Sequence, residues 1–130
     1  MKICIIDDEP IVVQTLSAYL GDLGHSVIGY GSRNELDAAL VDPAVDLVIA
    51  DLRLPGLNGI KLIRRVNQLF PGAPIVAVSG HRADATSMRD VIENEAYAFL
   101  HKPFGLGELD SLLARLEKER AAGPGGSHER

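Results

Sequence analysis

The chain has 130 residues, of which 46% are hydrophobic and 24% are charged, and its formal net charge is −5. A chain of this length forms one domain with its own hydrophobic core. Because the excess charge is acidic and no basic run occurs, direct binding to nucleic acid is not expected. No apolar run approaches the roughly 20 residues that span a bilayer, and the amino-terminal residues do not have the pattern of a signal peptide. We therefore expect a cytoplasmic protein without a membrane role.

Short apolar runs alternate with amphipathic segments along the chain. Strands are predicted at residues 2–6, 26–30, 47–50, 75–78 and 98–101. Helices are predicted after each strand, at residues 10–23, 32–40, 60–70, 83–94 and 106–116. This alternation predicts a doubly wound α/β fold with a parallel sheet. We assign residues 1–120 to this domain and the Gly- and Pro-rich residues 121–130 to a mobile tail.

Capping and turn residues indicate where several of these elements begin and end. Ser32, with Glu35 three residues later, forms a possible capping box for the second helix. Gly24 is placed to end the first helix, and residues 54–59 have the composition of a turn-rich loop. Cys4 is the single cysteine and lies inside an apolar run, so we expect a buried thiol that forms no internal disulfide.

Polar side chains follow the predicted strands at their carboxyl ends. They are Asp7 with Asp8, Asp51, Ser79 and Lys102. One acid after a strand is commonly a turn residue or a helix cap, but four such strand ends meet at one edge of a parallel sheet. Three carboxylates close together repel one another, so they require a compensating cation. Carboxylate oxygens without His or thiolate ligands suit Mg²⁺.

These residue types predict phosphoryl chemistry at Asp51. Its carboxylate would act as a nucleophile and become an aspartyl phosphate. Mg²⁺ would neutralise charge between the phosphoryl oxygens and the acids, while Lys102 and Ser79 would hold the other oxygens. Positioning and electrostatics would then carry most of the catalysis.

Four segments of the chain closely resemble the receiver domain of two-component response regulators. They are residues 5–10 (IIDDEP), 51–59 (DLRLPGLNG), 78–80 (VSG) and 99–103 (FLHKP). The resemblance covers roughly residues 2–118. It implies a flavodoxin-like (βα)5 fold whose five parallel strands have the order 2-1-3-4-5. It also implies that a sensor histidine kinase or a histidine phosphotransfer protein donates the phosphoryl group to Asp51.

The resemblance also implies roles for residues around the acceptor. Asp8, Asp51 and the backbone carbonyl of Arg53 would be the ligands of Mg²⁺. Asp7 would act through a water molecule. The peptide bond before Pro103 would be cis, which is plausible because cis bonds are largely confined to proline.

A conformational switch is implied as well. Ser79 would move toward the phosphoryl group and Phe99 would follow, which would change the surface of the fourth helix, fifth strand and fifth helix for a downstream protein target. Phe99 lacks the hydroxyl of a Tyr, so outputs that depend on that hydroxyl are not expected, and plain core packing is its alternative role. As a hypothesis, the side chains of Arg53 and His81 set the lifetime of the phosphorylated state.

Two other kinds of protein would fit part of this pattern. A flavodoxin-like nucleotide or flavin binder would share the fold, but Asp7, Asp8 and Glu9 would repel a phosphate from the first loop. An Asp-nucleophile phosphohydrolase would use the same covalent step, but Arg53 stands where its second acid would be. We therefore do not expect an enzyme: the protein would catalyse only its own phosphorylation and dephosphorylation.

The position of the protein in a signalling system is open. None of the acids, the hydroxyl or the lysine is missing, so a receiver that only binds partners is disfavoured. A stand-alone regulator that acts by protein contact is the preferred interpretation. A phosphorelay shuttle and the receiver portion of a hybrid histidine kinase are the alternatives.

Overall fold

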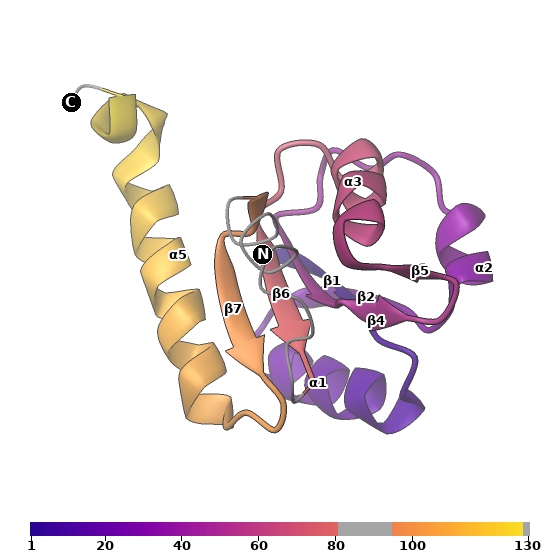
Figure 1. Ribbon diagram of the computed structural model, residues 1–130. Helices are drawn as coiled ribbons and strands as arrows, with labels where there is room; N and C mark the ends of the chain where they lie inside the picture. Colours follow the sequence, from indigo (N-terminus) through magenta and orange to yellow (C-terminus); the bar gives the residue numbers. More distant parts are fainter. Residues whose placement is uncertain (81–94, 129–130) are drawn as a thin grey trace.

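A computed structural model describes residues 1–80 and 95–128 of the chain. Its centre is a five-stranded sheet in the order β2-β1-β3-β6-β7, in which all neighbouring strands are parallel (Figure 1). The strands are β1 Lys2–Ile6, β2 Ser26–Tyr30, β3 Leu47–Asp51, β6 Ile75–Ser79 and β7 Ala98–His101. These are the five strands predicted from the sequence, so the predicted fold class and strand order are confirmed.

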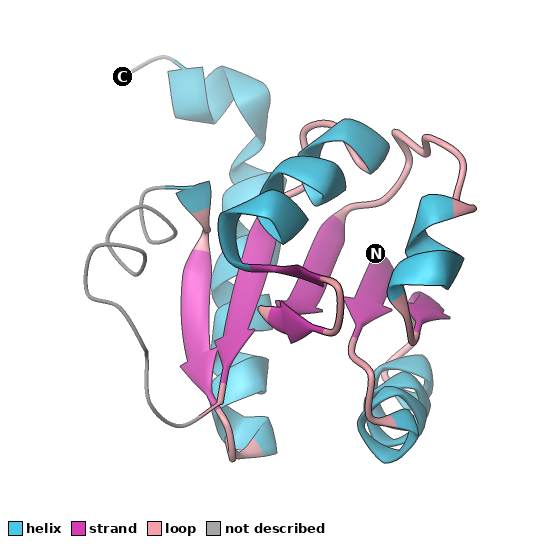
Figure 2. Cartoon of the chain, turned by 45° about the vertical axis from the view of Figure 1, so that its right-hand side comes forward, coloured by secondary structure: helices cyan, strands magenta, loops and turns pink. Residues whose placement is uncertain are grey.

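Helices cover both faces of the sheet (Figure 2). They are α1 Pro10–Asp22, α2 Arg33–Asp37, α3 Gly59–Leu69 and α5 Leu106–His128. Helices α1 and α5 share one hydrophobic core with the sheet, and α2 and α3 share the other. The helix predicted over residues 83–94 lies outside the described residues. In the described part of the chain, none of the helices combines the length and apolar character that a membrane span requires.

The central strands contribute to both cores, which explains their continuous apolar sequences. In β1, Ile3 and Ile5 face the core under α1 and α5, while Cys4 and Ile6 face the core under α2 and α3. Every residue of β3 is buried. Strands that are covered by helices on both faces have no solvent side on which polar residues would alternate.

The loop after β3 contains a hairpin that was not predicted. Residues 54–59 were expected to form a turn-rich loop; the structure has a turn there, and it joins a short antiparallel hairpin of β4 Arg53–Leu54 and β5 Leu57–Asn58. Gly56 occupies the turn with φ of +84°, a conformation that glycine adopts without strain. The Leu54 side chain is fully buried, so it anchors the hairpin to the core under α2 and α3.

The second helix is shorter than predicted. It ends at Asp37 rather than near Leu40, because Leu36 packs into the core whereas Leu40 is exposed and adds no packing. The Ser32 hydroxyl accepts a hydrogen bond from the amide of Glu35 at 3.1 Å, as expected. The Glu35 carboxylate accepts from the amide of Gly31 at 2.6 Å instead of from Ser32, so the capping box is only half formed.

The last helix is longer than predicted. Among residues 106–122, the last buried residue is Leu116, but α5 continues to His128 and includes residues that the sequence assigned to a tail. Residues 117–122 are strong helix formers, which extends the helix beyond its contact with the core. The mobility of residues 121–130 stays a prediction.

The buried thiol of Cys4 has a measurable consequence. Burial raises the pKa of Cys4 to about 12, with a smaller contribution from the charge of Asp42. Since the thiolate is the reactive form, alkylation by iodoacetamide at pH 8 should be at least about 100-fold slower in the folded protein than in urea. The same shift makes stability depend on pH. The free energy of unfolding includes a favourable contribution from Cys4 at pH values below the pKa of its thiol in the unfolded chain, about 8.5, and this contribution is lost as the pH rises toward the pKa in the folded protein. Mass spectrometry measures the alkylation rate. Equal rates for the folded protein and the protein in urea would contradict the burial of the Cys4 side chain.

Candidate functional site

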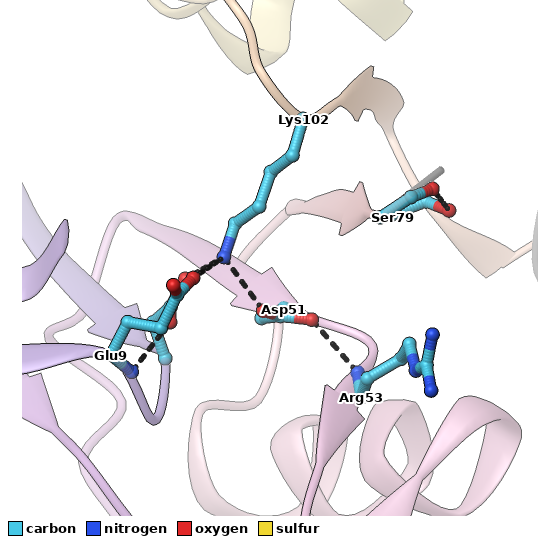
Figure 3. A network of polar contacts seen from close by, with 7 residues as sticks. Glu9, Asp51, Arg53, Ser79 and Lys102 are labelled. Carbon is cyan, nitrogen blue, oxygen red and sulfur yellow. Dashed lines mark hydrogen bonds and ion pairs between the residues drawn. The ribbon is translucent and has the colours of Figure 1, made fainter. Parts of the chain in front are cut away.

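The sheet brings residues from three strand ends to one edge. Strands β1 and β3 are neighbours, with Ile6 paired to Ala50, so the next residues along each strand, Asp7 and Asp51, lie side by side. Lys102 follows β7, which is separated from β3 by β6. Figure 3 shows the long Lys102 side chain reaching from its loop to the Asp51 carboxylate.

The ammonium group of Lys102 contacts three carboxylates. They belong to Asp7 at 2.8 Å, Glu9 at 2.7 Å and Asp51 at 2.9 Å from Nζ. Asp7 and Asp51 are the only buried charged residues in the described part of the chain, with 3% and 7% of their surface exposed. A buried carboxylate requires a counter-charge, and Lys102 supplies it to both.

Burial and charge shift the pKa values of this cluster. Burial is the main cause that raises the pKa of Asp7, and the charge of Asp51 adds to it, while Lys102 and the Glu9 amide oppose it. Burial acts to lower the pKa of Lys102, but its hydrogen bonds to the three carboxylates outweigh burial and leave the pKa raised. Lys102 therefore remains a cation at neutral pH.

The second oxygen of Asp51 is held by the backbone that follows it. Asp51 Oδ1 accepts a hydrogen bond from the Arg53 amide at 2.9 Å, whereas Oδ2 faces Lys102. Asp7 is fixed in the same way, because its Oδ1 accepts from the Glu9 amide at 2.9 Å. These contacts orient both carboxylates toward one another and toward the edge of the sheet.

Three acids at this edge could hold a metal ion. Asp7, Asp8 and Asp51 each offer a carboxylate oxygen, and these oxygens lie within 4.8 Å of one another. Asp8 is exposed and the other two are buried. A donor set made only of carboxylate oxygens fits a hard cation such as Mg²⁺. The separate roles expected for the Arg53 carbonyl and for a water on Asp7 stay predictions.

The other predicted site residues are Ser79, Phe99 and His81, of which the structure describes the first two. Ser79 ends β6 at the same edge, but its hydroxyl donates to the carbonyl of Gly80 at 2.9 Å, so contact with a phosphoryl oxygen would require it to turn (Figure 3). Phe99 is half-buried against the core under α2 and α3, and its ring lies 6.4 Å from that of His101. His81 lies outside the described residues. The bond between Lys102 and Pro103 is cis, as the resemblance implied.

Glu9 is a member of the cluster that sequence reasoning missed. It was considered only as one of three acids that repel a bound phosphate. In the structure it contacts Lys102, which lies 93 residues further along the chain. Its position directly after Asp7 and Asp8 indicated that it could lie near the site, but the sequence does not show which of these three consecutive acids contacts the lysine.

Comparisons with known proteins identify the family of the chain. Residues 3–114 match the family model of the response regulator receiver domain. The chain is 31% identical over 119 residues to the C4-dicarboxylate transport transcriptional regulatory protein DctD of Rhizobium meliloti, an alignment that covers 92% of this chain and 26% of that protein. The chain thus spans about a quarter of the length of this curated relative.

Solved structures show the same fold. A response regulator receiver domain protein from Clostridium thermocellum matches with a TM-score of 0.75 and 23% identity over 92% of this chain and 96% of that one. The non-phosphorylated HemR receiver domain from Leptospira biflexa matches with a TM-score of 0.75 and 28% identity over 88% and 92% of the two chains. Because the family model spans most of the chain and solved receiver domains share its fold, the protein belongs to the response regulator receiver domains of two-component systems.

Proposed function

We propose that this receiver domain accepts a phosphoryl group from a phosphohistidine donor onto Asp51 in a Mg²⁺-dependent reaction. One observation supports the proposal above the others. Asp7 and Asp51 both contact the Lys102 ammonium and both belong to the acid cluster with Asp8, but only Asp51 ends a strand that neighbours β6, the strand that ends at Ser79. A carboxylate in that position has a cation on one side and a candidate metal site on the other.

The covalent step needs little from the protein beyond positioning. A carboxylate oxygen of Asp51 attacks phosphorus, the new P–O bond forms, and the P–N bond to the donor histidine breaks. The electron pair of that bond stays on the imidazole nitrogen, which takes up a proton. Lys102 pairs its ammonium with the oxygens of the transferring group, whose negative charge would otherwise face several acids.

The acid cluster would hold the metal that this chemistry requires. Asp8, Asp51 and the carbonyl of Arg53 would be direct ligands, and Asp7 would act through water. When bound, Mg²⁺ supplies positive charge between the phosphoryl oxygens and the carboxylates.

The proposed output is a change of surface. Ser79 would turn from Gly80 toward the phosphoryl group, Phe99 would shift, and the face formed by β7, α5 and the helix predicted over residues 83–94 would bind a protein target. A histidine kinase or a phosphotransfer protein would be the donor, and the domain would turn over no other substrate. DctD is named a transcriptional regulatory protein, so the same switch would suit a receiver that controls further domains.

Labelling with a small phosphodonor tests this function. With Mg²⁺ and acetyl phosphate, the intact mass should increase by one phosphoryl group, and EDTA should prevent the increase. Hydroxylamine should remove the group, because it cleaves acyl phosphates. No increase, an increase in EDTA, or a product stable to hydroxylamine would contradict the proposal.

A further inference from the structure

Glu9 lies where the loop after β1 enters helix α1. It occupies the N-cap position, but its side chain makes no capping hydrogen bond. Side chains at this position usually accept from amides of the first helical turn. The Glu9 carboxylate instead contacts Lys102 Nζ at 2.7 Å, the shortest of the three contacts that this ammonium makes (Figure 3).

These three contacts use the full hydrogen-bonding capacity of Lys102. An ammonium group has three N–H donors and no acceptor. Asp7, Glu9 and Asp51 each lie within hydrogen-bonding distance of it. A phosphoryl oxygen therefore obtains a donor from Lys102 only when one of the carboxylates gives up its contact.

Exposure indicates which contact is released. The Glu9 side chain is 57% exposed, whereas the side chains of Asp7 and Asp51 are 4% and 9% exposed. Water replaces the contact of an exposed carboxylate at little cost, but a buried carboxylate that loses its cation has no such replacement. Glu9 is thus the partner from which Lys102 separates most easily.

We infer that Glu9 is a positioning residue that holds Lys102 inside the acid cluster before phosphorylation and competes with the incoming phosphoryl group for its ammonium. The inference rests on the proposed function, because it concerns the cost of phosphorylating Asp51. Glu9 restrains the reaction: the receiver reacts more slowly with a donor than the same site would without this contact.

Two substitutions separate the contact from the charge. Glu9→Ala removes both, whereas Glu9→Asp keeps the charge on a side chain that is one methylene shorter and should lose the contact with Lys102. At saturating Mg²⁺, both variants should lower the half-saturating acetyl phosphate concentration by about 1.4- to fivefold, the range that corresponds to exposed ion pairs. The control Asp22→Asn also removes one negative charge, at the far end of α1 and about 18 Å along the helix from Pro10, and should change nothing.

A second readout follows Lys102 without any donor. In ¹⁵N-labelled protein, the Nζ signal of Lys102, assigned by its loss in Lys102→Arg, should show slow proton exchange with water in the parent. Exchange should be at least about twofold faster in both Glu9 variants, because a donor is freed to water. A purely structural role of Glu9 would not move this signal.

The outcomes distinguish this inference from the proposed function. Unchanged exchange at Lys102, slower phosphorylation of the Glu9 variants, or acceleration in Glu9→Ala alone would overturn the inference; the last result would show simple charge repulsion. If the parent protein takes up no phosphate, the proposed function fails, and the exchange rate still decides whether Glu9 holds the ammonium.

Discussion

Replacing Asp51 with asparagine should reduce phosphorylation by acetyl phosphate at least about 100-fold, because the carboxylate is the nucleophile and an amide cannot replace it. The substitution keeps the shape of the side chain. Its carbonyl oxygen can still accept the hydrogen bond from the Arg53 amide that Asp51 Oδ1 accepts now. The loss should therefore be chemical rather than structural, and intact mass spectrometry after incubation with Mg²⁺ and acetyl phosphate measures it.

The matched control is again Asp22→Asn, which changes an exposed aspartate at the end of α1 in the same way. It should label like the parent protein. Labelling of Asp51→Asn to the parental extent would show that another residue is the acceptor, and peptide mapping of that product would locate it. The family assignment would stand in that case, but the proposed role of Asp51 would not.

Replacing Lys102 with alanine should lower the free energy of unfolding by about 2–4 kcal/mol in EDTA. This loss is smaller than that expected for a fully buried ion pair, because Lys102 is partly exposed. The substitution leaves Asp7 and Asp51 buried side by side without the cation that contacts both. Urea unfolding followed by circular dichroism measures the difference from the parent.

Added Mg²⁺ should reverse much of this loss. A divalent cation bound to the acid cluster would replace the missing charge and stabilise the folded state by mass action. The parent should gain less from Mg²⁺, because its cluster already contains an ammonium group. The control Lys61→Ala removes an exposed lysine of α3 and should lose little stability in either buffer. Equal stability of Lys102→Ala and the parent in EDTA would contradict the counter-charge role of Lys102.

Local patterns were enough to predict the sheet. Parallel strands that are covered on both faces must be apolar along their whole length, so the strand at residues 47–50 was visible as an uninterrupted run. The order of the strands came from the resemblance to receiver domains. The end of α2 could not be predicted from local patterns, because the length of this helix depends on whether Leu40 packs against the core, and Leu40 is exposed.

The sequence by itself determined that Asp7, Asp51 and Lys102 would lie at one edge of the sheet, because the carboxyl ends of parallel strands share an edge. Only the tertiary structure decided the direction of the polar side chains, such as the contact of Glu9 with Lys102 and the turn of the Ser79 hydroxyl to Gly80. The physical reason for this difference is that helix and strand preference, and the pattern of buried residues, follow from residues that are close together in the sequence. A hydrogen bond also depends on distances of a few tenths of an ångström between groups that the folded chain brings together.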